Sequence, residues 1–379
     1  MTTALTVMGD VRSTILTPLL GWKFEYNINP LIVSTTTSNG GSVDWADSTA
    51  VLSTTTATTS SSAQITSIRN LAAISGLGVV VRFTAAFTAG QAGTTQLIGL
   101  GDAYNGFFFG YNGTDWGILQ RQNNSDTWTA KADWSQSVEG QNFADTIVPT
   151  TLNAYQITFP ASRVGLISFY IQDPVGGTWI LVHTIEDANS DLYPAIYHVN
   201  LPLIAQVANL STTSAISLYT SSASAFTEGT ESEYLPEIHE HVSASVIGVT
   251  TATPILSVQN ATTFASVTNG KTCTLENFSV AVESGYPVSL NFLKNATLDS
   301  PSWTSVAATS SVAQYDTSST VATGGTNLYS FMFSSSDSAF IELESMQFVM
   351  TPGDIITISA EPLATTSTDV FLTVGWEES

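Results

Sequence analysis

The feature that most constrains this chain is an Asn-Gly pair, Asn112-Gly113, between two apolar runs, Phe107–Tyr111 and Trp116–Leu119. Asn-Gly is the strongest short-range hairpin signal, because a type I′ turn needs a positive φ at both central positions. The two runs are therefore predicted to be paired antiparallel strands. Glycines at 99, 101, 106, 110 and 117 punctuate this region, which suits bulges and close backbone approach. The pattern indicates a β-sandwich or jelly roll, and it contains no catalytic motif that we recognise.

Short apolar segments separated by turn signals recur about every ten residues along most of the chain, which is typical of all-β sandwiches. In the first half, the predicted strands after residue 78 include residues 154–159, 166–171 and 179–185. In the second half they include residues 331–333, 340–343, 355–358 and 370–374, and no convincing helix is present. The predicted fold class is all-β, with two tandem antiparallel β-sandwich or jelly-roll domains.

A Ser- and Glu-rich stretch, residues 221–240, marks the predicted domain boundary near residue 245. Residues 31–245 are predicted to form a jelly-roll domain, and residues 246–379 a small C-terminal β-sandwich domain. Residues 1–30 are mixed in character and contain several apolar side chains. Two interpretations stay open for them: an N-terminal arm that anchors the protein to a partner, or the first strand of the sandwich.

The balance of charge excludes several classes of partner. The chain has 31 acidic residues against 9 Lys and Arg, a formal net charge of −22, and only 11% charged residues in total. Nucleic-acid binding needs a positive footprint, so we expect no nucleic-acid partner, and an anionic membrane surface is also disfavoured. Because neutral polar surfaces cost less to desolvate than charged ones, the composition suits close lateral protein contacts. The excess of carboxylates also suits weak binding of divalent cations.

The single cysteine, Cys273, excludes an intrachain disulfide and is expected to be a buried strand residue. The N-terminal segment does not follow a signal-peptide pattern, and no run of 18 apolar residues predicts a membrane span. These features predict synthesis in a reducing cytoplasm without membrane insertion.

The segment from Thr95 to Leu119, with the letters TQLIGLGD and GFFFGYNGTDWGIL, resembles a segment of structural proteins of double-stranded DNA viruses. Both tailed phages and large algal or amoebal viruses have such proteins. Val164–Asp173, Trp179–His183 and Ala188-Asn189 continue the resemblance. The stretch Asp337–Glu378 resembles the small β-domain that often ends these proteins. The resemblance implies a concanavalin-type, lectin-like jelly roll in the first domain.

This resemblance predicts a structural protein of the virion surface: a capsid-decorating, fibre, vertex or tail-associated protein. It would be made in the host cytoplasm, would reside in the virion, and would act by assembly and attachment rather than as an enzyme. The expected partners are further copies of the chain in a closed homo-oligomer, most plausibly a trimer, other capsid or tail proteins, and host surface glycans. The alternative is a carbohydrate-binding adhesin or lectin for receptor recognition. A third is a polysaccharide-degrading enzyme, although no carboxylate pair stands out.

Aromatic, amide and carboxylate side chains gather in one short region and predict a carbohydrate site. Such sites combine an aromatic platform with hydrogen-bonding partners. The competing interpretation is that the aromatic residues pack in the core and that Asn and Asp serve turns. The predicted binding residues are Tyr104, Asn105, Tyr111, Asn112, Asp115, Trp116, Trp128 and Trp134.

His239 and His241 are two residues apart, so on a strand both imidazoles point to the same face. With Glu237 they form the predicted metal site, because two imidazoles and a carboxylate can hold zinc or a similar ion. The competing interpretation is a solvated acidic linker. No other cofactor is predicted.

Overall fold

The computed structural model describes residues 16–71, 73, 76–135, 143–186, 192–210, 212–229, 238–283, 286–346, 348–364 and 367–378. The chain divides into two compact units, residues 1–233 and 234–379. This division lies before the predicted boundary at residue 245, because the strand Ile238–Val249 (β17) pairs along its length with Thr368–Glu378 (β31) of the second unit. Residues 1–15 of the predicted arm lie outside the described residues. Leu16–Lys23 (β1) form a strand of the first unit.

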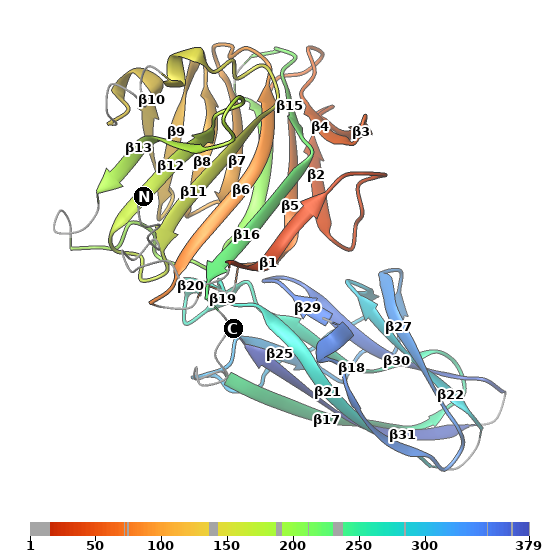
Figure 1. The fold of residues 1–379 in the computed structure, drawn as a ribbon. Coiled ribbons are helices and arrows are strands. Elements are labelled where there is room, and N and C mark those ends of the chain that lie inside the picture. Colours follow the sequence, from red (N-terminus) through yellow and green to blue (C-terminus); the bar gives the residue numbers. More distant parts are fainter. Residues whose placement is uncertain are drawn as a thin grey trace. The chain divides into compact units, whose positions relative to one another are not determined.

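The described part of the first unit is a sandwich of two antiparallel sheets (Figure 1). One sheet has the order β13-β12-β11-β6-β15-β4-β3, and β16 joins β6 to β1. It contains β1, β3 (Ser42–Ala46), β4 (Thr49–Ser53), β6 (Gly78–Phe87), β11 (Asn153–Pro160), β12 (Leu166–Gln172), β13 (Trp179–Glu186), β15 (Ser217–Thr220) and β16 (Ser222–Glu228).

The other sheet, which we call the seven-stranded sheet, has the order β10-β9-β8-β7-β14-β5-β2. A short 3₁₀ turn, Lys131–Asp133 (η1), follows its edge strand β10. The strands are β2 (Val33–Ser38), β5 (Ser62–Asn70), β7 (Thr94–Gly101), β8 (Gly106–Asn112), β9 (Asp115–Gln122), β10 (Ser125–Ala130) and β14 (Pro202–Asn209).

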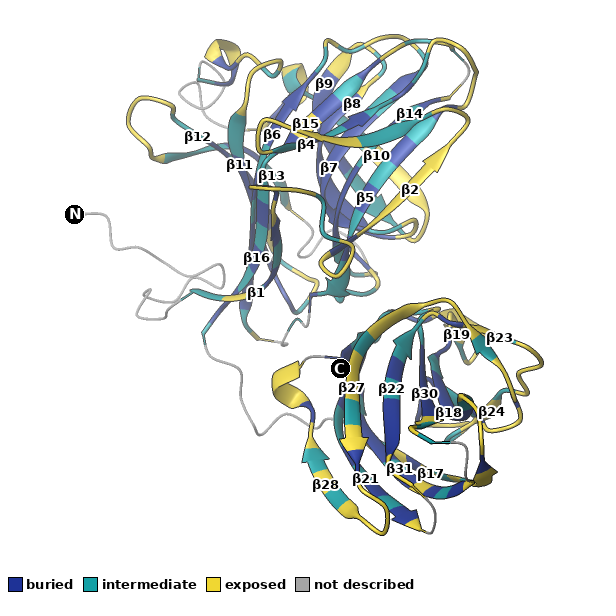
Figure 2. Cartoon of the chain, turned by 90° about the vertical axis from the view of Figure 1, so that its right-hand side faces the viewer, coloured by how far each residue is buried: buried dark blue, intermediate teal, exposed yellow. Residues whose placement is uncertain are grey.

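An apolar core lies between these two sheets. Strands of both sheets carry buried residues (Figure 2). The core is rich in aromatic rings: Phe109 packs against Tyr155 at 4.9 Å and against Phe169 at 5.5 Å between centroids. Burial of such rings is the main favourable term in folding. One face of the seven-stranded sheet packs on this core, and the other face points away from it.

The predicted hairpin is confirmed, with a shift of one residue in the turn. Asn112 pairs with Asp115, so the two loop residues are Gly113 and Thr114 rather than Asn112 and Gly113. Gly113 has a φ of +62°, whereas Thr114 is not among the positive-φ residues. Glycine at the first central position is the type II′ pattern, and it sets which side chains of β8 and β9 face the core.

The described part of the second unit is also an antiparallel sandwich, which confirms the predicted all-β class in both halves. One sheet has the order β17-β31-β21-β28, and β29 (Phe348–Met350) also pairs with β21. The other has the order β24-β25-β18-β30-β22-β27. Their remaining strands are β18 (Thr253–Asn260), β21 (Cys273–Glu283), β22 (Val288–Lys294), β24 (Thr304–Ser305), β25 (Ala313–Asp316), β27 (Thr326–Phe333), β28 (Ser338–Glu342) and β30 (Ile355–Pro362).

Smaller elements complete the second unit: the two-stranded pairs β19 (Thr263–Phe264) with β20 (Val267–Thr268) and β23 (Thr297–Leu298) with β26 (Ala322–Thr323), and the 3₁₀ turn η2 (Glu344–Met346). The core between its two sheets includes Trp376 and Phe278, both fully buried. Cys273 is also fully buried and unpaired, as predicted.

Candidate functional site

The outer face of the seven-stranded sheet carries apolar side chains that point away from the main core. In β7, Ile98 and Leu100 join the core, so Leu97 faces the other side. A separate small cluster forms there from Leu97, Phe108, Leu119 and Ile204, and Trp128 packs against it half-buried. An apolar floor with an aromatic ring at its side is a feature of ligand sites.

Glycines keep the centre of this face open. Gly110 of β8 lies opposite Leu97 on one side and opposite Gly117 of β9 on the other. A Cβ on Gly110 would collide with the main-chain oxygen of Gln96, and one on Gly117 would collide with that of Thr129. These positions therefore exclude side chains unless a neighbouring strand moves.

Two adjoining hollows lie over this face, with volumes of about 570 and 490 Å³. We call them together the groove. Both are lined by the same four polar side chains, Gln64, Gln206, Arg121 and Asp126. Trp128, Leu97 and Leu119 line the second hollow, so the polar groups and the apolar floor face the same space.

Arg121 is the best-anchored polar group in the groove. Its Nε and Nη2 donate to Oδ1 and Oδ2 of Asp126 at 2.7 and 2.9 Å, and its Nη1 donates to the main-chain oxygen of Asp102 at 3.0 Å. The guanidinium also lies over the Phe108 ring, 5.6 Å from its centroid. A fork of this kind is rigid, so the remaining lone pairs of Asp126 are held in a fixed direction.

One end of the groove is built by two turns, at residues 102–105 and 123–124. Asp102 Oδ1 accepts the N–H groups of Tyr104 and Asn105, both at 2.7 Å, which closes the first turn. Asn124 N–H donates to the main-chain oxygen of Tyr104 at 2.8 Å and joins the second turn to the first. Asp102, Ala103 and Asn124 line the groove at this end.

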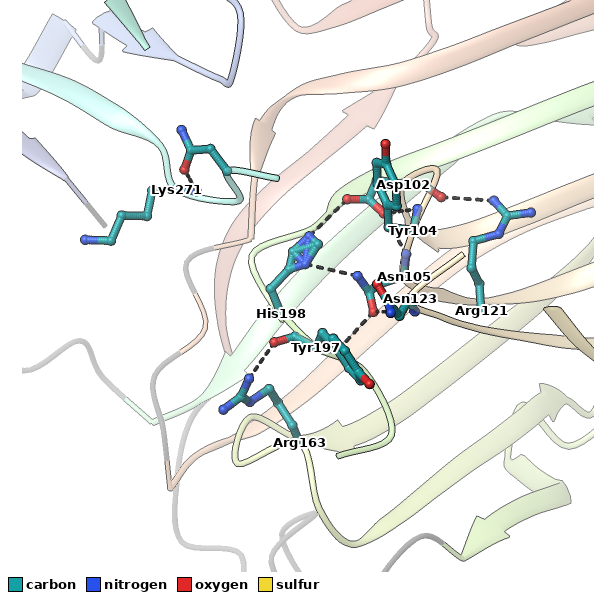
Figure 3. A network of polar contacts seen from close by, with 10 residues as sticks. Asp102, Tyr104, Asn105, Arg121, Asn123, Arg163, Tyr197, His198 and Lys271 are labelled. Atoms are coloured by element: carbon teal, nitrogen blue, oxygen red, sulfur yellow. Dashed lines mark hydrogen bonds and ion pairs between the residues drawn. The ribbon is translucent and has the colours of Figure 1, made fainter. Parts of the chain in front are cut away.

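A buried amide, that of Asn105, connects these turns to residues 197–198 (Figure 3). Its Oδ1 accepts the N–H groups of Tyr197 at 2.9 Å and Asn123 at 3.3 Å. Its Nδ2 lies 3.1 Å from Nδ1 of His198. Arg163 Nη1 donates to the main-chain oxygen of Tyr197 from the other side.

His198 also faces the carboxylate of Asp102, with 3.2 Å between Nε2 and Oδ2, although the pair is not aligned as a hydrogen bond. Burial lowers the pKa of the His198 imidazole below its ordinary value of 6.5. The Asp102 carboxylate raises that pKa and the Arg163 guanidinium lowers it, and the net direction is downward. His198 is therefore neutral at neutral pH.

The structure removes part of the predicted aromatic platform from the surface. Trp116 and Trp134 lie in the core between the sheets, 8% and 2% exposed, with their ring centroids 5.1 Å apart. Tyr111 also belongs to that core, and its ring packs edge-on against Phe87. The competing interpretation, core packing, applies to these three residues. The hairpin register turns Tyr111 and Trp116 inward, and Trp134 enters the core directly after the 3₁₀ turn η1.

The other predicted sugar-binding residues lie in several places. Trp128 and Asn112 line the groove. Tyr104 is 40% exposed in the 102–105 turn, whereas Asn105 is 2% exposed. We call Asn105 the hub, because its side chain contacts Tyr197, Asn123 and His198 (Figure 3). Asp115 is exposed beside the hairpin turn, where it faces Thr114.

The predicted metal site is only partly described, because Glu237 lies outside the described residues. His239 and His241 both lie on β17 and are exposed, in agreement with their predicted common face. His239 Nδ1 is 3.0 Å from Oε2 of Glu276. Within the described ranges, no group of three His, Cys, Asp or Glu side chains is arranged to hold a metal ion.

Sequence reasoning missed several groove residues, among them Gln64, Gln206 and Arg121, and the hub partner His198. Gln64 and Gln206 sit on neighbouring strands that are far apart in sequence, so only the register brings them together. The ion pair had a local signal, because Arg121 and Asp126 flank the turn-forming pair Asn123-Asn124.

No protein-family model matches the chain, and no curated protein matches it. Among solved structures, the chain is similar to the cellulose-induced protein Cip1 (15% identity, TM-score 0.35), covering 55% of this chain and 96% of that one. It is similar to peanut lectin (10% identity, TM-score 0.35), covering 56% and 99%. A pseudo beta-1,3-glucanase of Mycobacterium tuberculosis has 10% identity, a TM-score of 0.40, and coverages of 56% and 99%.

These similarities are too distant to carry a function, so the site is assigned from this chain's own residues. Among the residues that the structure describes, no helix is long and apolar enough to cross a membrane.

Proposed function

We propose that the first unit binds carbohydrate in the groove on the outer face of its seven-stranded sheet. The observation that supports this most directly is the lining: Trp128 beside an apolar floor, with Gln64, Gln206 and the Arg121–Asp126 pair around it. A pyranose ring offers C–H groups that pack on an aromatic face and hydroxyls that pair with amides and carboxylates.

Gln206 is the amide best placed for such pairing. It lines both hollows, on the face of β14 opposite to the core residues Ala205 and Val207. It lies next to Gln64 on the neighbouring strand, so two amides offer donors and acceptors side by side. An all-apolar ligand would leave these groups without partners, which favours a hydroxyl-rich ligand.

We propose binding without cleavage. The two carboxylates that line the groove are already engaged, Asp126 with Arg121 and Asp102 with the N–H groups of its own turn. A glycosidase needs one carboxylic acid and one carboxylate free on either side of the bond. Release of reducing ends from any bound polysaccharide would overturn this part of the proposal.

A glycan array with the purified full chain tests the proposal. We expect wild-type protein to bind at least one class of glycan. Binding should fall about fivefold to tenfold in Trp128→Ala, because an aromatic contact of this kind contributes about 1–1.4 kcal/mol. Tyr26→Ala is the matched control, since Tyr26 is an 83%-exposed aromatic residue that does not line the groove. Equal binding by both variants would overturn the assignment of the groove.

The resemblance to virion proteins leads to a finer proposal, that the chain works at a virion surface and attaches the particle to host glycans. In this proposal it assembles as a closed homo-oligomer, most plausibly a trimer, with other capsid or tail proteins as neighbours. The support is the sequence resemblance together with a neutral face on the second unit. That face, on the sheet of β17, β31, β21 and β28, has a hollow of about 630 Å³ lined only by uncharged residues, including Ser243, Ser279, Phe340 and Phe371.

Light scattering with and without EDTA tests this assembly. A trimer that is insensitive to EDTA, and that dissociates in Phe371→Asp, would support contact through the neutral face. A monomer at all concentrations would contradict self-assembly while leaving glycan binding untouched. Dissociation by EDTA would instead support a role for the metal site predicted from Glu237, His239 and His241.

A further inference from the structure

The hydrogen bonds around Asn105 fix the orientation of its amide. Oδ1 accepts two main-chain N–H groups, those of Tyr197 and Asn123, so the oxygen cannot be exchanged with the nitrogen without breaking both. The NH₂ group must then point at His198, 3.1 Å away. Nδ1 of His198 therefore accepts a hydrogen bond and carries no proton. The neutral imidazole is thus the Nε2–H tautomer, with that N–H on the side of Asp102.

A protonated His198 does not fit this arrangement. Imidazolium carries a hydrogen on both nitrogens, so Nδ1–H would face the NH₂ group of Asn105, donor against donor. Asn105 is 2% exposed and has little access to water that could compensate. Either the Asn105 amide turns and loses its hydrogen bonds from Tyr197 and Asn123, or the His198 ring moves away from Asn105. The charged groups that face His198 are Asp102, which favours the imidazolium, and Arg163, which opposes it.

The contacts of Asn105 connect His198 to the groove. Asn105 belongs to the turn at residues 102–105, and through Asn123 it holds the turn at residues 123–124. Asp102, Ala103 and Asn124 of these turns line the groove, and Arg121 donates to the main-chain oxygen of Asp102. These contacts link His198 to Arg121 through the turn at residues 102–105 (Figure 3). Arg121 in turn holds the carboxylate of Asp126.

We propose that His198 is a positioning residue for this end of the groove: as the Nε2–H tautomer it holds Asn105 and both turns in place, and its protonation loosens them. The inference rests on the proposed function only for its consequence, a loss of glycan binding in acid. The positioning itself is a property of the protein without any ligand. The positioning role of His198 and the proposed glycan binding can therefore be contradicted independently.

Nitrogen-15 NMR of the labelled full chain, without ligand, tests the positioning. The imidazole signals of His198 are assigned by their loss in His198→Asn. At about pH 7.5 we expect Nδ1 to be unprotonated and Nε2 to carry the hydrogen. On acidification the amide signals of Ala103, Tyr104 and Asn124 should shift with the same midpoint as His198, below 6.5. An Nδ1–H tautomer, or turn amides that do not follow His198, would overturn the proposal.

Two variants separate the contacts of His198. The side-chain oxygen of Asn can take the place of Nδ1 and accept from Asn105 without titrating, whereas Gln places its amide near Nε2 and leaves Asn105 without an acceptor. We expect His198→Asn to keep the turn amides in their neutral-pH positions in acid, and His198→Gln to displace them at every pH. Tyr26→Ala, at an exposed residue of the first unit that does not line the groove, is the control and should respond to pH as wild type does.

The consequence is tested by repeating the glycan array at about pH 7.5 and about pH 5. We expect wild-type binding to fall at least several-fold in acid, and His198→Asn binding to be insensitive to pH. If the NMR result holds but no glycan binds at either pH, the proposed function fails and the positioning role stands. If glycan binding is strong and equal at both pH values, the regulatory consequence is wrong.

Discussion

Arg121 holds the carboxylate of Asp126 in a two-bond fork across adjacent strands, with 2.7 Å from Nε to Oδ1 and 2.9 Å from Nη2 to Oδ2. The two residues are direct cross-strand neighbours, in the hairpin formed by β9 and β10. The Arg121 side chain is only 15% exposed, whereas that of Asp126 is 48% exposed. The carboxylate of Asp126 is therefore more accessible from the groove than the guanidinium of Arg121 is.

This asymmetry predicts different results for the two members of the pair. Arg121→Met should lower the free energy of unfolding by about 2 kcal/mol, because it also removes the bond to the Asp102 oxygen and the contact over the Phe108 ring. Asp126→Asn should cost less than about 1 kcal/mol, as exposed ion pairs do. Both variants should weaken glycan binding. Urea titrations give the stabilities, and equal losses would contradict this account of the fork.

Removal of the indole should mainly lower the stability of the protein at Trp134 and mainly weaken glycan binding at Trp128. Trp134→Ala opens a cavity next to Trp116 and Phe109 in the core, so it should cost about 3–5 kcal/mol. Trp128→Ala exposes part of the small outer cluster and should cost roughly 1–2 kcal/mol while abolishing most glycan binding. Denaturation midpoints and the glycan array check this pair of outcomes. A folded Trp134→Ala protein with normal stability would contradict the placement of that ring.

Gly110 should not tolerate even one methyl group. Its Cβ would collide with the Gln96 main-chain oxygen, so Gly110→Ala should lower the free energy of unfolding by about 1–3 kcal/mol and distort the groove floor. Ala208→Ser, on β14 of the same sheet and in the same lining, is the control because a side chain already exists there. Urea denaturation of both variants decides the matter. A neutral Gly110→Ala substitution would mean that β7 and β8 adjust without cost.

The hairpin could be predicted from sequence, but its facing residues could not. The Asn-Gly signal located the turn, and β8 and β9 do pair there. The run GFFFGYN is apolar on both faces, since Phe107 and Phe109 enter the core while Phe108 joins the outer cluster. Alternation is hidden in such a run, because the side chains on both of its faces are apolar. The sequence pattern therefore could not show that Trp116 faces the core.

Trp128 and Asn112 of the groove were predicted from sequence, but Gln64 and Gln206 were beyond sequence reasoning for a different reason. Gln64 and Gln206 face each other across β5 and β14, which are about 140 residues apart along the chain. Single polar residues at alternate strand positions carry no local signal of function. The hub at Asn105 is similar: its residue type fitted a turn, but its partner His198 comes from a remote segment.

Asp316 gives the second unit a pH-dependent anchor. The carboxylate is 2% exposed, and although burial raises its pKa, hydrogen bonds from Ser302, Ser318 and Ser319 lower it to about 2. Because the folded pKa lies below the ordinary value of 3.8, the stabilisation is complete above pH 3.8 and is lost as the pH falls through about 2.

Asp316→Asn should therefore lower the free energy of unfolding by roughly 1–2 kcal/mol at neutral pH and by much less near pH 2. Hydrogen exchange of β25 in both proteins across this pH range measures the difference, with Glu342→Gln, at an exposed carboxylate of β28, as the control. A difference that persists unchanged below pH 2 would show that Asp316 acts through packing rather than charge.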